Sequence, residues 1–192
     1  MTRKHFLSTA GAAVGAAAVP PLAAALPGAA APAARPNASS TSNVPAPSVA
    51  AKVVRAAEGT PYGVLGTAMT HKLTGADTYG QLMWLEDHNP PGAAIPLHVH
   101  TREDELFRVL EGRVEFTIGT EALTLGPGDV AFAPRYVPHA WRVVGEAPAR
   151  TIMTAFPAGI EHMFGELAEL PAGPPDLARV AQVCGRYGIY FV

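Results

Sequence analysis

The amino-acid sequence predicts an all-β protein. From about Lys52 onward, apolar and polar residues alternate in short runs, which is the pattern of strands with one buried face. Clusters of Gly, Pro and Asn separate these runs, as turns between antiparallel strands do. About eight such runs fit either a double-sheet jelly roll or an immunoglobulin-like sandwich, and the alternation alone leaves both architectures open.

The elements follow one another along the chain. The expected strands span residues 63–70, 78–87, 105–110, 113–118, 122–125, 129–133, 140–144 and 150–156. Two helical segments follow the last strand, at residues 160–170 and 175–185, and we expect them on the outside or at the mouth of the β domain. Asp176 is placed to act as an acidic residue at the N-terminus of the second helix.

Residues 1–34 have the layout of an export signal, with a basic start at Arg3 and Lys4, an Ala- and Gly-rich run, and small residues suited to cleavage. The start resembles the twin-arginine export motif, with Lys4 in place of the second arginine. An exported protein without a permanent membrane span is therefore expected. Residues 35–51 read as a flexible linker, residues 52–160 as the β domain, and residues 161–192 as a helical extension.

The charge balance excludes one class of partner. After residue 50 the chain holds 11 Lys and Arg against 16 Asp and Glu, a net charge of −5. An acidic domain argues against nucleic acid, because phosphate binding needs a basic face. The chain has one cysteine, Cys184, so an intrachain disulfide is not possible.

Two histidines two residues apart carry the strongest chemical signal. In a strand, His98 and His100 point to the same face, with their Cα atoms ~6.7 Å apart. Glu105 follows five residues later. Imidazole nitrogens and a carboxylate form a mixed ligand set that suits Fe(II), Mn, Ni, Co, Cu or Zn. The pattern therefore predicts one divalent transition metal.

The spacing around these residues closely resembles that of the cupin superfamily. The first cupin motif is matched by Gly92, His98, His100, Glu105 and Gly112, and the second by Gly128, Pro134 and His139. Tyr136 stands where the family has glycine, and Val143 where it has asparagine, which puts the turn geometry in question. Glu103 is the nearest competitor to Glu105, and the family spacing selects Glu105.

This resemblance implies the fold and the ligand set. The expected fold is a double-stranded β-helix, or jelly-roll barrel, followed by short C-terminal helices. The implied metal ligands are His98, His100, Glu105 and His139. Cupins commonly dimerise through their sheets, so a homodimer is a possible assembly.

The alternation also suggests which residues line a substrate pocket. Glu105 shares a face with Phe107, and His139 shares one with Trp141. By the resemblance, the strand at residues 78–87 should line the cavity as well. The candidate pocket residues are Gln81, Met83, Phe107, Phe132 and Trp141. Core packing is the competing interpretation for each apolar member of this set.

The ligand set and the short single domain resemble the small cupins grouped with quercetin 2,3-dioxygenase. That resemblance implies a metal-dependent dioxygenase acting on a flavonol-like or other enolic or phenolic aromatic small molecule, with dioxygen as co-substrate and Glu105 as a catalytic base. Two alternatives stay open: a metal-dependent isomerase or polyketide cyclase that does not use dioxygen, and a module that binds a small ligand.

Overall fold

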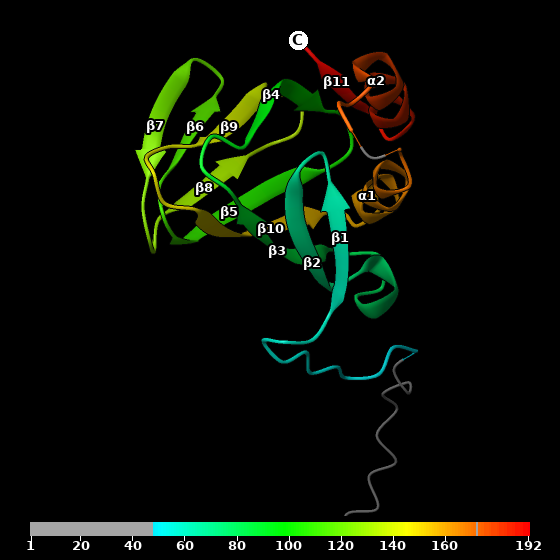
Figure 1. Cartoon of the computed structure of the whole chain (residues 1–192). Helices are drawn as coiled ribbons and strands as arrows, with labels where there is room; N and C mark the ends of the chain where they lie inside the picture. The colour runs from blue at the N-terminus through cyan, green and yellow to red at the C-terminus, as the bar shows by residue number, and fades with distance from the viewer. Residues whose placement is uncertain (1–47, 172) are drawn as a thin grey trace, which may run out of the picture. The chain divides into compact units, whose positions relative to one another are not determined.

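The structure, a computed structural model, describes residues 48–171 and 173–192. These residues form eleven strands and two α-helices, and the strands lie in two antiparallel sheets (Figure 1). The expected export signal, residues 1–34, and most of the expected linker lie outside the described residues. No helix within the described ranges is long and apolar enough to cross a membrane.

Six strands form the first sheet, in the order β1, β2, β3, β10, β5, β8. Their bounds are β1 Thr60–Val64, β2 Thr67–Leu73, β3 Met83–Asn89, β10 Ala149–Phe156, β5 Asp104–Glu111 and β8 Val130–Ala133. Along β10 every second residue is buried, because successive side chains of a strand point to opposite faces. The sheet therefore has one face in the core and one nearer solvent.

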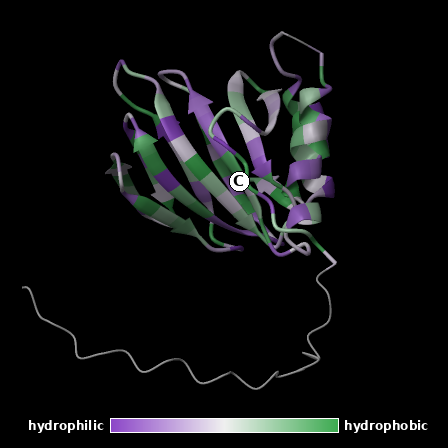
Figure 2. Cartoon of the chain, turned by 90° about the horizontal axis from the view of Figure 1, so that it is seen from below, coloured by the Kyte–Doolittle hydropathy of each residue, from purple (hydrophilic) through white to green (hydrophobic). Residues whose placement is uncertain are grey.

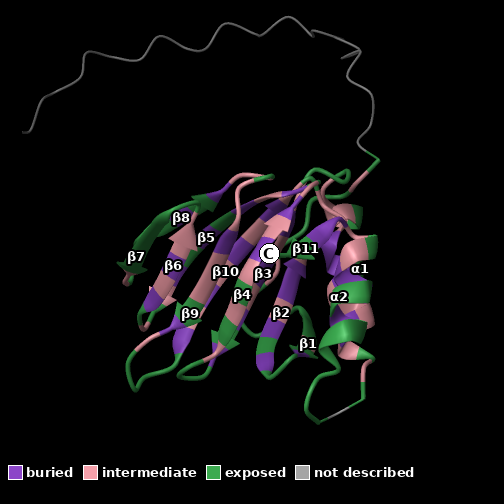
Figure 3. Cartoon of the chain, turned by 90° about the horizontal axis from the view of Figure 1, so that it is seen from above, coloured by how far each residue is buried: buried purple, intermediate pink, exposed green. Residues whose placement is uncertain are grey.

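Five strands form the second sheet, in the order β11, β4, β9, β6, β7. Their bounds are β11 Ile189–Phe191, β4 Ala94–His100, β9 His139–Val143, β6 Val114–Ile118 and β7 Glu121–Leu125. The edge strand β7 is exposed along most of its length (Figure 3). Strands β4 and β9 lie next to each other in the sheet, and their register places His98 opposite His139.

The two sheets pack face to face around one hydrophobic core. Figure 2 shows apolar and polar residues alternating along the strands. The core includes Leu85, Val109, Val114, Phe116, Val143 and Met153. Burying a side chain of this size stabilises the fold by about 1.5–3 kcal/mol before entropy is counted. The prediction of an all-β, jelly-roll fold is confirmed.

Two helices cover one side of the sheets (Figures 1 and 3). Helix α1, Ile160–Ala168, packs on β1, and helix α2, Leu177–Arg186, packs on β11. The Asp176 carboxylate accepts hydrogen bonds from the backbone N–H groups of Ala178 and Arg179, at 3.0 and 3.1 Å. Asp176 therefore caps α2, as expected from the sequence.

The first hairpin differs from the sequence prediction, which had one strand at residues 63–70. The chain instead turns at Leu65 and Gly66, and Val64 pairs with Thr67. Both turn residues have positive φ, 51° and 86°, as a two-residue hairpin of this hand requires. Leucine is uncommon in that position, so the sequence carries a weak turn signal there.

Strand β3 begins later than expected, at Met83 rather than residue 78. A short 3₁₀ turn at Gly75–Asp77 precedes it, and the Asp77 carboxylate accepts hydrogen bonds from the Thr74 N–H and hydroxyl at 3.0 and 3.1 Å. Such side-chain bonds to nearby backbone compete with strand pairing. Residues 78–82 therefore lie outside the sheet.

Candidate metal centre

A cavity of about 90 Å³ lies between the two sheets and the two helices. Its wall is mostly apolar. The apolar lining includes Met69, Leu85, Phe107, Trp141, Met153 and Met163. His98, His100 and Glu105 supply a polar region of the lining. An apolar enclosure with a few convergent polar groups is typical of a small-molecule site.

Four side chains converge beside this cavity, three from adjacent strands of the second sheet and one from the first sheet. His98 and His100 come from β4, Glu105 from β5 and His139 from β9. Each offers one ligand atom, these atoms lie within 4.8 Å of one another, and all four residues are buried. The strand alternation inferred from the sequence explains why all four point inward.

The outer nitrogens of two rings are held by backbone carbonyls. His98 Nδ1 lies 2.8 Å from the Pro96 carbonyl oxygen, and His139 Nδ1 lies 3.1 Å from that of Val137. A carbonyl can only accept, so Nδ1 carries the hydrogen and the Nε2 lone pair is available for a ligand bond. This tautomer is the one that a metal site with Nε2 ligands needs.

The imidazole Nε2 atoms and the Glu105 carboxylate oxygen are close enough to bind a shared cation. His139 Nε2 lies 2.9 Å from Glu105 Oε2, and His100 Nε2 lies 3.5 Å from the same oxygen. Two lone pairs at such a distance repel unless a positive charge lies between them, either a proton on the imidazole or a metal ion. Three imidazoles and one carboxylate therefore suit a transition metal.

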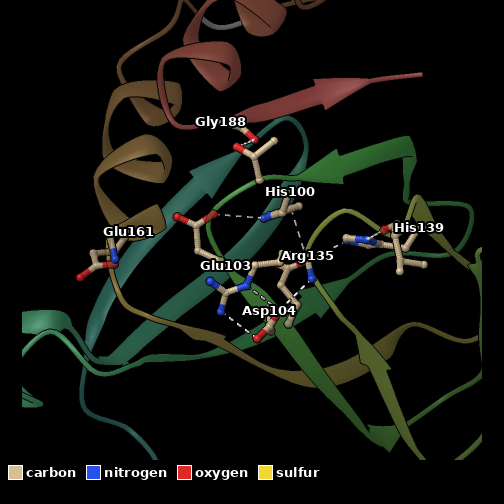
Figure 4. Close-up of polar contacts among 11 residues, drawn as sticks. His100, Glu103, Asp104, Arg135, His139, Glu161 and Gly188 are labelled. Atoms are coloured by element: carbon tan, nitrogen blue, oxygen red, sulfur yellow. Dashed lines mark hydrogen bonds and ion pairs between the residues drawn. The ribbon is translucent and has the colours of Figure 1, made fainter.

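Glu103 lies behind His100 rather than in the cluster. Its Oε2 is 3.5 Å from His100 Nδ1, both residues are buried, and neither of these two atoms has another partner (Figure 4). A carboxylate on the outer nitrogen of a ligand histidine fixes the ring and raises its basicity. The structure thus separates the two glutamates: Glu105 faces the three imidazoles and Glu103 orients one of them.

Charge interactions within the cluster set its protonation. Burial would raise the pKa of Glu105, but the neighbouring imidazoles, His100 foremost, hold it at about 2. Burial, reinforced by the charge of His139, lowers the pKa of His98 to about 4. Glu105 is therefore anionic and His98 neutral at neutral pH, which are the states in which each binds a cation.

The turn before His139 is tied to both ligand strands. The Arg135 N–H and guanidinium donate three hydrogen bonds of 2.8–2.9 Å to the Asp104 carboxylate (Figure 4), and the Tyr136 N–H donates to the His100 carbonyl at 2.7 Å. Tyr136 has φ 67°, so it adopts the left-handed conformation that glycine supplies at this position of the motif. Tyr136 is 68% exposed, so its ring does not enter the cavity lining and the residue adopts a positive φ without glycine.

The structure places two of the five expected pocket residues, Phe107 and Trp141, on the cavity wall. It places three elsewhere. Gln81 is exposed in the turn before β3, and Met83 is fully buried in the core. Phe132 is 49% exposed, because the alternation of β8 turns its neighbours Ala131 and Ala133 inward.

Among the described residues, three further histidines lie outside the cluster. His71 is buried between the rings of Tyr62 and Phe164, with centroids 4.5 and 5.7 Å away. Burial lowers its pKa to about 4, so it is neutral. His88 and His162 are exposed.

Several cavity residues were not anticipated from the sequence. Asp87 lies on the cavity wall, and α1 and α2 contribute Met163, Phe164 and Cys184. The inward face of β3 runs through Met83 and Leu85, and extending it by two residues would have found Asp87. Nothing in the helical pattern indicated which helix face would close the cavity.

Comparison with known proteins agrees with this architecture. Residues 87–156 match the family model described as Cupin domain. Germin-like protein 1-4 of Oryza sativa subsp. japonica is 34% identical over 145 residues, which cover 66% of this chain and 61% of that protein. Quercetin 2,3-dioxygenase of Bacillus subtilis (strain 168) is 33% identical over 73 residues, which cover 38% of this chain and 21% of that protein.

A solved structure shares the fold. An RmlC-like cupin from Shewanella frigidimarina NCIMB 400 superposes with a TM-score of 0.51 at 19% identity, covering 59% of this chain and 96% of that one. The chain spans less than two thirds of either of the two relatives named above, so their names do not transfer to it. The domain match, the shared fold and the motif spacing nevertheless agree that residues 87–156 form a cupin domain.

Proposed function

We propose that this protein is a metal-dependent oxidoreductase that uses dioxygen to oxidise a small enolic or phenolic compound. The observation that carries the proposal is the buried cluster of three imidazoles and one carboxylate at the wall of an apolar cavity. A transition metal held by four such ligands acts as a Lewis acid and, if redox-active, supplies electrons to dioxygen.

The chain's own residues supply the surroundings for that chemistry. The apolar wall, including Phe107 and Trp141, excludes water and so strengthens the electrostatic interactions inside. Glu105 is the one carboxylate among the four clustered residues, and it accepts the proton of a substrate hydroxyl that comes within hydrogen-bond reach. Glu103 and the backbone carbonyls of Pro96 and Val137 orient the imidazoles before substrate arrives.

Cavity size favours a compact substrate. The cavity measures about 90 Å³, whereas an engineered protein cavity of about 150 Å³ holds one benzene ring. By this comparison a single phenolic ring would already need some outward movement of α1 and α2, and a flavonol, with three rings, would need much more. The partial match to quercetin 2,3-dioxygenase supports the reaction class, and we expect a smaller member of the enolic or phenolic class as substrate.

Dioxygen uptake tests this proposal. The full chain would be stripped of metal, reloaded separately with Fe(II), Mn, Ni, Co, Cu or Zn, and given a panel of 1,3-diketones, catechols and flavonols. Uptake is expected with a redox-active metal, fastest with the compact substrates, and absent with Zn. Glu105→Gln should retain part of the metal and lose uptake.

Two outcomes would replace the proposal. Metal-dependent loss of a substrate without dioxygen uptake would point to an isomerase or cyclase. Protein that binds no metal and keeps its stability would exclude both kinds of enzyme and leave a small-ligand-binding module.

A further inference from the structure

Asp87 is a second carboxylate in the cavity, distant in sequence from the metal ligands. It lies on β3, an interior strand between β2 and β10, and lines the same cavity as His98, His100 and Glu105. Its residue is 8% exposed. A position on an interior strand is held rigidly, as a recognition group requires.

The protein leaves most of the hydrogen-bonding capacity of Asp87 unused. Among the described residues its one side-chain partner is Thr151, whose hydroxyl donates at 3.5 Å, the outer limit for such a bond. Its neighbours on the wall are apolar, with Met69 paired opposite it and Leu85 and Met153 nearby. A buried carboxyl group with so little compensation is costly, which indicates a partner that the protein itself does not provide.

Asp87 and the metal ligands lie at different levels of the cavity. In the first sheet, Asp87 pairs with Thr151, and Thr151 pairs with Val109 on β5. Glu105 pairs with Ala155, four residues further along β10. A molecule bound at one end by the metal centre therefore extends its other end toward Asp87.

We propose that Asp87 binds a hydroxyl group at the end of the substrate away from the metal centre. The inference deepens the proposed function and rests on its metal site: it makes the substrate a compact enol or phenol that carries a second, remote hydroxyl. A hydroxyl suits this position because it donates to a carboxylate and accepts from a protonated acid. An anionic group would be repelled by the ionised carboxylate and by Glu105.

The protonation of Asp87 is compatible with this role. Burial, followed by the charge of Glu105, raises its pKa to about 7. A bound divalent cation offsets the charge of Glu105 and leaves burial as the main cause. In either state the carboxyl group retains a hydrogen-bonding atom for a hydroxyl.

A matched pair of redox-inert probes tests the inference. Butanohydroxamate and 3-hydroxypropanohydroxamate both chelate a metal through two oxygens and differ only in a terminal methyl or hydroxyl. Their dissociation constants would be measured by calorimetry on the Zn-loaded full chain, for wild type, Asp87→Leu, Asp87→Asn and His88→Gln. His88 is the exposed neighbour on the same strand and serves as the control.

The preference for hydroxyl over methyl should fall about tenfold or more in Asp87→Leu, the loss expected for one hydrogen bond to a charged group. Asp87→Asn, which still bonds a hydroxyl, and His88→Gln should keep most of the preference. If the leucine variant does not fold, Asp87→Ala supports the same comparison. A preference that is unchanged in the leucine or alanine variant would overturn the inference.

Failure of the inference is distinguishable from failure of the proposed function. Equal binding of the two probes to wild type overturns the role of Asp87 without any turnover being measured. Binding of neither probe overturns the metal site itself, and with it both the proposed function and the inference that rests on it. An intact preference that depends on Asp87, combined with no dioxygen uptake by the Fe(II)-loaded chain on any substrate, supports the role of Asp87 and removes only the dioxygenase proposal.

Discussion

The cavity has two unlike walls. The ligand wall, formed by His98, His100 and Glu105 with His139 beside it, is polar, and each of the three histidines has an outer partner that fixes its orientation. The facing wall lies across the cavity from His98 and His100 and is formed by Met69, Leu85 and Met153 of the first sheet and Met163 of α1. It is apolar, and Asp87 is the ionisable residue among these side chains; Glu105 of the ligand wall comes from this same sheet. The first wall determines whether a cation binds, and the second determines which molecule fits beside it.

This contrast has a physical origin. Groups that bind a cation must be oriented before it arrives, so they need partners of their own. Groups that enclose an apolar substrate need only volume and flexibility, which methionine supplies. We therefore expect substitutions on the ligand wall to act on metal content and those on the facing wall to act on substrate choice and pH dependence.

Loss of a ligand should have the largest effect. His139→Ala removes one of four converging ligand atoms, so metal should fall from about one ion per chain to a small fraction of that value. Elemental analysis of protein purified without chelator measures the change. His162→Ala, at an exposed histidine, should retain full metal; equal loss in both variants would show that the cluster is not the site.

Loss of the carboxylate behind a ligand should have an intermediate effect. Glu103→Gln removes the charge 3.5 Å from His100 Nδ1, and outer partners of this kind contribute about 10–100-fold in metal affinity. Competition with a chromogenic chelator gives the affinity. Glu121→Gln, on the exposed strand β7, is the control, and an affinity equal to wild type in Glu103→Gln would remove Glu103 from the site.

On the facing wall, the pH dependence of stability should change. The pKa of Asp87 is raised to about 7, so in the folded protein it stays protonated where the unfolded chain has lost the proton. Its contribution to the free energy of unfolding is thus full below about pH 4 and is lost as pH rises to about 7. Asp87→Asn should remove this decline, which amounts to a few kcal/mol at most, at about 1.4 kcal/mol per pKa unit.

Urea unfolding of metal-free wild type and variant across this pH range checks the expectation. His98, with its lowered pKa, contributes a slope of opposite sign, and subtracting the two curves cancels it. Identical slopes would mean that Asp87 is already ionised in the folded protein at pH 5.

The smallest effect is expected at the turn that precedes His139. Tyr136→Gly relieves a left-handed backbone at φ 67° and should raise the free energy of unfolding by about 0.5–1 kcal/mol. Tyr136→Ala loses the ring but keeps the Cβ, so it should show no gain. Thermal unfolding distinguishes them, and a gain in both would assign the effect to the exposed ring.

The same contrast explains which parts of the fold and of the site the sequence could predict. The ligand wall is encoded by residue type and spacing, because His98 and His100 must share a strand face and only a few residue types bind metals. The facing wall depends on which strands become neighbours. Gln81 was expected there because residues 78–87 alternate, but side-chain hydrogen bonds of Asp77 and Thr78 hold that segment in a turn.

Phe132 shows a second limit. Its aromatic ring suggests a cavity residue, yet β8 places two small residues inward, and Phe132 stacks on Phe156 at 6.3 Å outside. Alternation assigns the residues of a strand to two faces. It does not show which face is buried when both faces carry apolar residues. The contribution of the helices to the cavity likewise follows from tertiary packing, which local pattern does not encode.

The three methionines that line the cavity can also report whether reactive oxygen species form there. Met69, Met153 and Met163 line the space beside the clustered ligands, and a methionine that meets a reactive oxygen species gains one oxygen atom, about 16 Da, as the sulfoxide. Oxygen chemistry that escapes its substrate would mark these residues ahead of the other methionines. Peptide mass spectrometry would therefore detect this oxidation even after metal and substrate have been removed.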